Sequence, residues 1–172
     1  DSYRMHGKGS SKYENVRIGM NSRLDTIQAS ILQVKLKAFA EELEAVNKAA
    51  AEYTARLADL VETPVVPAGF LSSWAQYTVR LNGKTERDGL QAYLEGQGIP
   101  SMVYYPTPLH RQTAYRDSGL PEPDCPVAGR LCETVLSLPM HPYISSEEID
   151  RVCNAIEAFL HREKEAGGER SR

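Results

Sequence analysis

Apolar residues recur every three or four positions from Leu24 to Leu60, and no glycine or proline interrupts the run before Pro64. The stripe consists of Leu24, Ile27, Ile31, Val34, Ala38, Leu43, Val46, Ala50, Tyr53, Leu57 and Leu60. Because residues three and four apart share one side of a helix, this spacing predicts a single amphipathic helix over residues 21–61. At 1.5 Å per residue it would be roughly 55 Å long. A globular helix is normally shorter, so we expect this one to bend near residues 39–42 or to bridge two bodies.

The pattern after the helix is shorter and mixed. Alternating or β-branched runs predict three strands, at residues 74–81, 99–105 and 134–140. Helical spacing predicts three further helices, at residues 85–97, at 127–133, and from Ser145 or Ser146 to about residue 163. This order predicts an α+β fold, in which a small antiparallel or mixed sheet carries helices on one face.

Turn and cap residues mark the ends of these elements. Thr85 is expected to cap the helix at 85–97, and Gly98 to close it. Ser145 and Glu148 have the spacing of a capping box. Residues 106–126 are rich in proline, which predicts an irregular segment.

The chain is predicted to have four parts. Residues 1–20 are polar, glycine-containing and basic, which is typical of an arm or loop. The long helix at 21–61 follows, then an α+β domain at 62–163 and a disordered tail at 164–172. The first residue is not methionine, so the start is expected to be the middle of a longer protein.

Composition and charge narrow the class of protein. The 172 residues are 41% hydrophobic and 25% charged, which suits one globular domain with an appended arm. The net charge of −3 gives no reason to expect a nucleic-acid partner. No apolar run approaches the ~18 residues of a membrane span, and no signal peptide is present. Three cysteines without metal or disulfide spacing are expected to be reduced thiols of a cytoplasmic protein.

The common catalytic motifs are missing: the sequence has no phosphate-binding loop, no dinucleotide fingerprint, no zinc-ligand spacing and no nucleophile elbow. Candidate chemistry begins instead at "NSR", residues 21–23, where the long helix starts. A helix start attracts anions, an asparagine amide donates to phosphate, and an arginine clamps phosphate or carboxylate. The structural alternative is a helix cap, supplied by Ser22 or Asp25, beside a surface arginine.

Two other stretches hold polar side chains at the ends of predicted strands. "VYYPTPLHRQ", residues 103–112, places tyrosines, a histidine and a glutamine on a stiff loop, where binding sites are common. The alternative there is aromatic packing under a proline-rich loop. "SLPMHPY", residues 137–143, places His141 between two prolines, and the alternative is a histidine with a structural hydrogen bond.

Three stretches in register, "IGMNSRLDTIQASIL", "VYYPTPLHRQ" and "LSLPMHPY", resemble the C-terminal part of the DegT-type nucleotide-sugar aminotransferases. These are pyridoxal-phosphate enzymes of fold type I. "HGKGSSKY" in the arm fits as well, so the resemblance covers about residues 3 to 162. "SSWAQYTVRL" is similar to the branch that acts on UDP-linked 3-oxo-uronic acid sugars for surface polysaccharides such as lipopolysaccharide.

The resemblance implies a homodimer whose active sites lie at the subunit interface. It implies that Asn21 binds the cofactor phosphate in the neighbouring subunit's site, and that Arg23 lies near the sugar substrate across the interface. Tyr105 would line the sugar pocket, and His110 matches a histidine of the family. Tyr104 stands where the family has histidine; it can hydrogen-bond but cannot carry a positive charge.

The resemblance also implies a part that these residues do not include. The family's Schiff-base lysine lies upstream, in a large domain, and no lysine of this sequence lies in its motif. We therefore expect no catalytic residue in this chain, and no transamination by it alone. The expected parent enzyme moves an amino group, with glutamate as the expected donor, to a UDP-linked keto sugar. The rival hypothesis is a non-enzymatic module for dimerisation or small-ligand binding.

Overall fold

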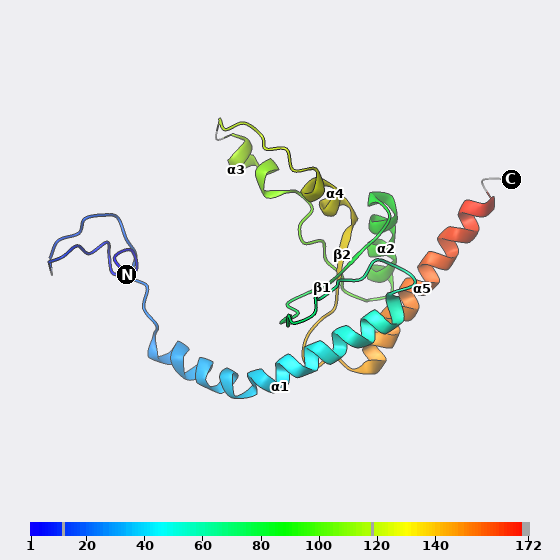
Figure 1. Cartoon of the computed structure of the whole chain (residues 1–172), viewed down its shortest axis with the longest axis horizontal. Helices are drawn as coiled ribbons and strands as arrows, with labels where there is room; N and C mark the ends of the chain where they lie inside the picture. The colour runs from blue at the N-terminus through cyan, green and yellow to red at the C-terminus, as the bar shows by residue number, and fades with distance from the viewer. Residues whose placement is uncertain (12, 118, 170–172) are drawn as a thin grey trace. The chain divides into compact units, whose positions relative to one another are not determined.

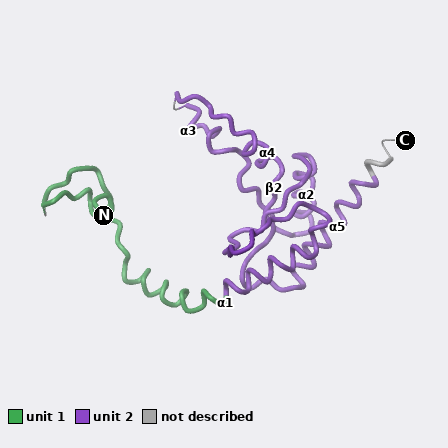
Figure 2. Tube along the Cα trace, viewed as in Figure 1, with its two compact units in different colours: residues 1–41 green, residues 42–172 purple. Residues whose placement is uncertain are grey.

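A computed structural model describes residues 1–11, 13–117 and 119–169. The chain divides into two units, Asp1–Glu41 and Glu42–Arg172 (Figures 1 and 2). In chain order, the elements are α1 (Thr26–Leu57), β1 (Tyr77–Arg80), α2 (Lys84–Gly96), the 3-10 helix η1 (Leu109–Arg111), α3 (Thr113–Arg116), α4 (Pro126–Thr134), β2 (Val135–Leu138) and α5 (Ser146–Glu169). The predicted α+β class is confirmed.

The long helix α1 has 32 residues, and the division between the units falls within it, at residues 41 and 42. The sequence prediction placed a boundary at 61 and 62 instead. The part of α1 in the second unit is buried through Val46, Ala49, Ala50, Tyr53 and Leu57. The two parts of this continuous helix therefore belong to different units and have different surroundings.

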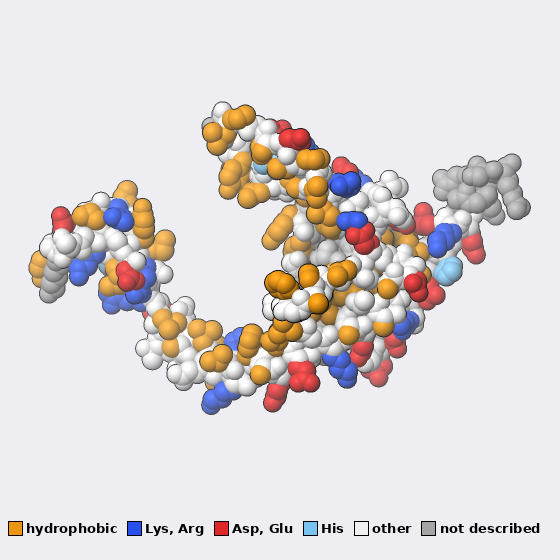
Figure 3. Space-filling model, in the orientation of Figure 1, with side chains coloured by type: hydrophobic (Ala, Val, Ile, Leu, Met, Phe, Trp, Pro, Cys, Tyr) orange, Lys and Arg blue, Asp and Glu red, His pale blue; other side chains and the backbone are white. Residues whose placement is uncertain are grey.

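The predicted apolar stripe is not buried along its whole length. Its first members Leu24, Ile27, Ile31 and Val34 are each more than half exposed. Figure 3 shows hydrophobic side chains on the surface of this part of α1. Periodicity reports which side of a helix is apolar, but a second surface is needed to bury it. Among the described residues, the first half of α1 has no such cover.

The core of the second unit forms where helices meet a two-stranded antiparallel sheet. Tyr77 pairs with Leu138 and Val79 with Leu136, and these side chains are buried. Around them pack apolar residues of α1, α2 and α5, including Tyr53, Leu57, Leu90, Leu94, Ile149, Ile156 and Phe159. The α5 helix runs beside the second half of α1 (Figure 1), and Arg56 bonds to both Asp150 and Asn154.

The predicted strand at 99–105 is wrong. Only Met102 in this segment pairs with the sheet, through two backbone hydrogen bonds with Ser137 of 2.8 and 3.1 Å. A β-branched and aromatic composition favoured a strand, but the chain turns away at residue 104 before a ladder can form. The segment still extends the sheet edge by one residue pair, and this pairing fixes where the next loop begins.

The helix ends follow the predictions in part. The capping box is present: the Glu148 amide donates to Ser145 Oγ at 3.2 Å, and the Ser145 amide donates to Glu148 at 2.9 Å. Gly98 closes α2 with a φ of +69°. Thr85 does not cap α2, because the helix already starts at Lys84 and Gly83 occupies the cap position.

Arg87 is a buried cation that the sequence did not single out. It lies on α2, donates to the carbonyls of Cys132 and Val135 at 3.2 Å, and contacts Asp88 at 2.7 Å. Burying a charge costs free energy unless the group is paired and hydrogen-bonded, as this one is. Arg87 therefore ties α2 to the junction of α4 and β2.

The arm in the first unit folds back on itself. Met5 bridges Asn21 and Lys8 bridges Asn15 in antiparallel fashion. Gly7 and Gly19 meet where the two segments cross, and a Cβ on Gly19 would lie 2.1 Å from the Gly7 nitrogen. A side chain at Gly7 or Gly19 would collide with backbone atoms of the facing segment, so this folded arm requires glycine at both positions.

The end of the chain differs from the prediction. Helix α5 extends to Glu169, so residues 164–169 are helical, and the remainder of the predicted tail, 170–172, lies outside the described residues. Across the described part of the chain, no helix combines the length and apolar character needed to cross a membrane.

Candidate functional site

The "NSR" residues line a polar hollow in the first unit. A cavity of about 630 Å³ is bounded by His6, Asn21, Ser22, Arg23, Asp25 and Gln28. Asn21 and Arg23 are both exposed. Asp25 directly precedes α1, and its carbonyl accepts the Ala29 amide at 2.8 Å. Asp25 thus occupies the cap position, and Asn21 and Arg23 are not needed to start the helix.

The folded arm brings His6 to this hollow. The His6 amide donates to the Met20 carbonyl at 3.0 Å, and the Ser22 amide donates to the Arg4 carbonyl at 2.9 Å. These bonds hold residues 4–6 beside residues 20–22. Sequence reasoning missed His6, because its place depends on a hairpin-like return that only the two close glycines permit.

Tyr104 and Tyr105 lie together at one end of the sheet in the second unit. Their rings pack edge to face with centroids 5.7 Å apart. Tyr104 is 41% exposed and Tyr105 is 69% exposed. Both phenols can therefore reach a ligand. Aromatic packing beneath a loop, the structural alternative, does not account for rings this open.

A cavity of about 290 Å³ lies beside Tyr104. It forms where the start of β1, the end of β2 and residues 100–104 meet, and it is lined by Ala75, Gln76, Pro100, Ser101, Met102, Tyr104, Ser137, Leu138, Pro139 and Met140. The Ser101 hydroxyl is buried and has no hydrogen-bond partner among the described residues. Neither Gln76 nor Ser101 stands out in the sequence.

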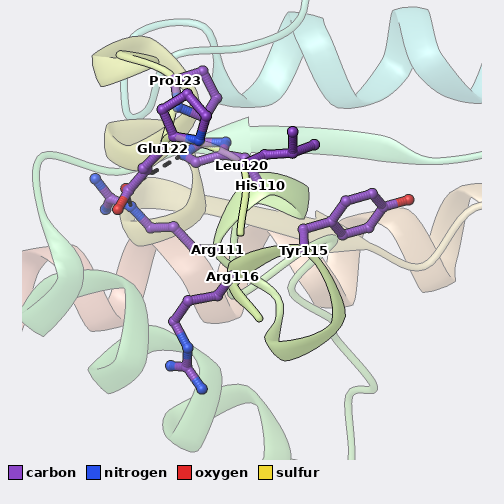
Figure 4. Close-up of a pocket in the computed structure, with 8 residues that line it drawn as sticks. His110, Arg111, Tyr115, Arg116, Leu120, Glu122 and Pro123 are labelled. Atoms are coloured by element: carbon purple, nitrogen blue, oxygen red, sulfur yellow. Dashed lines mark hydrogen bonds and ion pairs between the residues drawn. The ribbon is translucent and has the colours of Figure 1, made fainter. Parts of the chain in front are cut away.

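His110 lies in a separate cavity of about 490 Å³ in the second unit (Figure 4). The cavity is bounded by His110 and Arg111 of η1, Tyr115 and Arg116 of α3, and the loop residues Leu120, Pro121, Glu122 and Pro123. The His110 side chain is 15% exposed, and its Nε2 has no hydrogen-bond partner among the described residues. The segment at 106–126, predicted to be irregular, therefore contains two short helical turns, η1 and α3, and these help to form the cavity.

An ion pair closes one side of the His110 cavity. Arg111 Nε donates to Glu122 Oε1 at 2.7 Å, and Figure 4 shows the two side chains close together. This hydrogen bond lowers the pKa of the Glu122 carboxyl and raises the pKa of the Arg111 guanidinium. The same Glu122 oxygen is 3.9 Å from His110 Nε2, too far for a hydrogen bond. Two oppositely charged residues eleven positions apart gave no local signal in the sequence.

His141 has a structural bond. Its Nδ1 accepts the Tyr143 amide at 3.2 Å, which closes the turn after β2. This geometry supports the structural alternative for the "SLPMHPY" stretch.

The structure thus separates the predicted site residues into groups. Asn21 and Arg23 share one cavity in the first unit; Tyr104 and Tyr105 contact each other, and His110 lines a different cavity, in the second. Among the described residues, no group of histidine, cysteine or carboxylate side chains could hold a metal ion. The arrangement offers hydrogen-bond donors and cations suited to a polar, anionic small molecule.

Comparison with known proteins identifies a family. A sequence model of the DegT/DnrJ/EryC1/StrS aminotransferase family matches residues 1–157. The UDP-2-acetamido-2-deoxy-3-oxo-D-glucuronate aminotransferase of Pseudomonas aeruginosa is 41% identical over 152 residues, covering 88% of this chain and 40% of that protein. The UDP-N-acetyl-3-dehydro-alpha-D-glucosamine 3-aminotransferase of Acidithiobacillus ferrooxidans is 37% identical over 92% of this chain and 42% of that protein.

Solved structures agree. The crystal structure of a DegT DnrJ EryC1 StrS aminotransferase from Brucella abortus is 47% identical, with a TM-score of 0.82 over 92% of this chain and 42% of that one. The chain therefore spans about two fifths of the length of the relatives it matches.

Proposed function

This chain belongs to the DegT/DnrJ/EryC1/StrS aminotransferase family, and on that premise we propose that it is the C-terminal part of a nucleotide-sugar aminotransferase. The proposed parent enzyme transfers an amino group from glutamate to a UDP-linked 3-oxo-uronic acid sugar, for surface-polysaccharide synthesis. The observation that carries the proposal is that Asn21 and Arg23, surplus to the start of α1, line one open polar cavity. The identity to the Pseudomonas aeruginosa enzyme supports the choice of sugar.

The cofactor of this family is pyridoxal 5'-phosphate. When bound, it supplies the electron sink through which an amino group passes between donor and acceptor. The first-unit cavity fits its phosphate group, because Asn21 and Ser22 offer neutral hydrogen-bond donors to the phosphate oxygens. Asp25 also borders the cavity, and its backbone carbonyl accepts the Ala29 amide at the start of α1.

We assign the remaining site residues to the substrate. Arg23 steadies an anionic group of the sugar nucleotide, and Tyr104 and Tyr105 offer phenol hydroxyls to the sugar ring. His110 contributes from its own cavity. The covalent attachment of the cofactor is assigned to a lysine outside these residues, so the 172-residue chain alone is proposed to be inactive.

We further propose that the parent is a homodimer in which Asn21 and Arg23 complete the neighbouring subunit's site. Their exposure supports this, because both side chains remain available after the first unit has folded.

The test is an Asn21→Ala substitution in the parent-length enzyme. Losing one phosphate donor should weaken cofactor retention about 10- to 150-fold, since a hydrogen bond to a charged group contributes about 1.5–3 kcal/mol. The measurement is the cofactor content of the purified dimer after dialysis. Asn15→Ala is the matched control, because Asn15 lies in the same arm but does not line the cavity. Unchanged cofactor content in Asn21→Ala would refute the assignment.

A further inference from the structure

The cavity around His110 has the composition of a small-ligand site. Its loop side is apolar, with Leu120, Pro121 and Pro123, and Tyr115 adds an aromatic ring (Figure 4). Its polar groups come from His110, Arg116, the Tyr115 hydroxyl and the Arg111–Glu122 ion pair. At about 490 Å³ it lies within the range of small-molecule pockets, which are mostly apolar with a few placed polar groups.

His110 supplies an unused hydrogen-bonding group in this cavity. Its Nε2 is buried and without a partner in the described part of the chain. A buried polar atom normally has a partner, because leaving it unpaired costs about 1–3 kcal/mol. Glu122 does not serve, since it is 3.9 Å away and already accepts from Arg111. A small rotation of the imidazole toward a bound group would pair the nitrogen.

Arg116 supplies a cation at the exposed side. Its side chain is 68% exposed, and its Nε contacts the neighbouring Asp117 only at 3.4 Å. Figure 4 shows Arg116 and Tyr115 leaving α3 in different directions. Arg111 is less available, because Glu122 holds its Nε. The cavity thus combines apolar loop side chains and one buried, unpartnered nitrogen with the Arg111–Glu122 ion pair and the accessible guanidinium of Arg116.

We propose that this cavity holds the uridine diphosphate part of the substrate, with the uracil ring inside and the phosphates toward Arg116; this inference rests on the proposed function. A flat heterocycle suits the apolar wall and the Tyr115 ring, and a uracil carbonyl accepts from His110 Nε2–H. A sugar ring suits it less, since its hydroxyls point in many directions and would meet Leu120 and the prolines. The proposal makes Tyr115 and Arg116 nucleotide-binding residues and moves His110 from the sugar to the base.

The test uses the 172-residue chain, since every residue lining the cavity belongs to it. UDP is titrated into ¹⁵N-labelled protein, with uridine and inorganic pyrophosphate as separate probes. We expect saturable UDP binding with the largest amide shifts at residues 110–123, weaker binding of uridine at the same amides, and little effect of pyrophosphate. Absence of saturable binding, shifts centred elsewhere, or pyrophosphate binding as tightly as UDP would each overturn the proposal.

Variants assign the two ends of the nucleotide. His110→Ala should weaken UDP binding about tenfold, and His110→Gln should restore part of it, because the glutamine amide also donates. Arg116→Gln should weaken UDP binding several-fold and leave uridine binding unchanged. Arg130→Gln, which removes an exposed arginine that does not line the cavity, is the control. Equal losses in Arg116→Gln and Arg130→Gln would overturn the placement of the phosphates.

The two proposals fail separately. If the parent enzyme transfers amino groups to a UDP-linked keto sugar but UDP does not bind at residues 110–123, this inference is wrong and the proposed function stands. If UDP binds there but the parent transfers no amino group, the proposed function is wrong and the nucleotide site stands.

Discussion

Single hydrogen bonds at buried residues connect α1 to the strand end beside Tyr104. Tyr53 is fully buried and its hydroxyl donates to the Pro139 carbonyl at 2.9 Å. The neighbouring Thr54 hydroxyl is 2.7 Å from the Tyr77 hydroxyl, and burial raises the pKa of both tyrosines. Pro139 lines the cavity beside Tyr104. Tyr53 of the long helix is therefore hydrogen-bonded to a residue that lines this cavity, 86 positions further along the chain.

The Tyr53→Phe substitution tests this connection. It should lower the free energy of unfolding by about 0.5–1.5 kcal/mol, because the half-buried Pro139 carbonyl loses its donor while the ring stays packed. The measurement is urea unfolding. Tyr105→Phe is the control, and since Tyr105 is largely exposed its effect should stay within about 0.5 kcal/mol. Equal stability of Tyr53→Phe and the wild type would mean that the bond contributes nothing.

The starts of α5 and α2 differ in how closely they follow the cap residues predicted from the sequence. The start of α5 follows its capping box residue by residue, because Ser145 and Glu148 are close in sequence and bond directly. The start of α2 does not follow Thr85. There the Asn82 amide donates to Glu86 at 2.8 Å, so a carboxylate in the first turn serves a backbone group near the helix start. The sequence predicted Thr85 as the cap of this helix, but the helix starts at Lys84 and Gly83 occupies the cap position.

Substituting Ser145→Ala should destabilise the second unit by about 1 kcal/mol, the usual loss for a helix cap. Thr85→Ala, the residue first expected to cap α2, should be close to neutral. Thermal or urea unfolding of the two variants measures the contrast. A loss in Thr85→Ala as large as that in Ser145→Ala would contradict the cap positions described above.

The same cap predicts a pH dependence. The hydrogen bond from the Ser145 amide lowers the pKa of Glu148 below its ordinary value of 4.5. Its stabilising effect is therefore fully present above that value and is lost as the pH falls through the lower pKa of the folded state. Wild type and Glu148→Gln should accordingly differ in stability at neutral pH, and urea unfolding should show the difference disappearing as the pH falls through the lowered pKa of Glu148.

At the scale of the whole molecule, the two units differ in what holds them. The second unit has a continuous apolar core, whereas the first is held by backbone bridges in the arm and exposes the apolar side of α1. Local stability follows buried contacts, so we expect the two halves of one helix to differ.

Hydrogen exchange of the 172-residue chain measures this difference. Amides of residues 46–56, whose side chains enter the core, should exchange far more slowly than amides of residues 30–38 in the same helix. The comparison is matched, because both segments are helical and differ in burial. Uniform protection along α1 would show that its first half is covered in solution.

Much of the fold was predictable because its signals are local. The period of α1, the strands around Tyr77 and Leu136, the capping box and the glycine after α2 each depend on residues a few positions apart. The prediction of a strand at 99–105 was wrong because strand pairing depends on residues far apart in the sequence. Strand propensity describes a segment that fits a sheet, but pairing depends on where the partner strand ends.

The sequence by itself determined the family and the α+β class. It also singled out the candidate site residues Asn21, Arg23, Tyr104, Tyr105 and His110. These predictions depend only on the order and spacing of residues along the chain. Only the tertiary structure decided which side chains share a cavity. His6 joins Asn21 through the folded arm, and Glu122 pairs with Arg111. Ser101 and His110 keep buried polar atoms that have no partner within the described part of the chain. Those relations join residues far apart in sequence, and contacts of that kind are fixed by packing and chain reversal, for which a local pattern carries no signal.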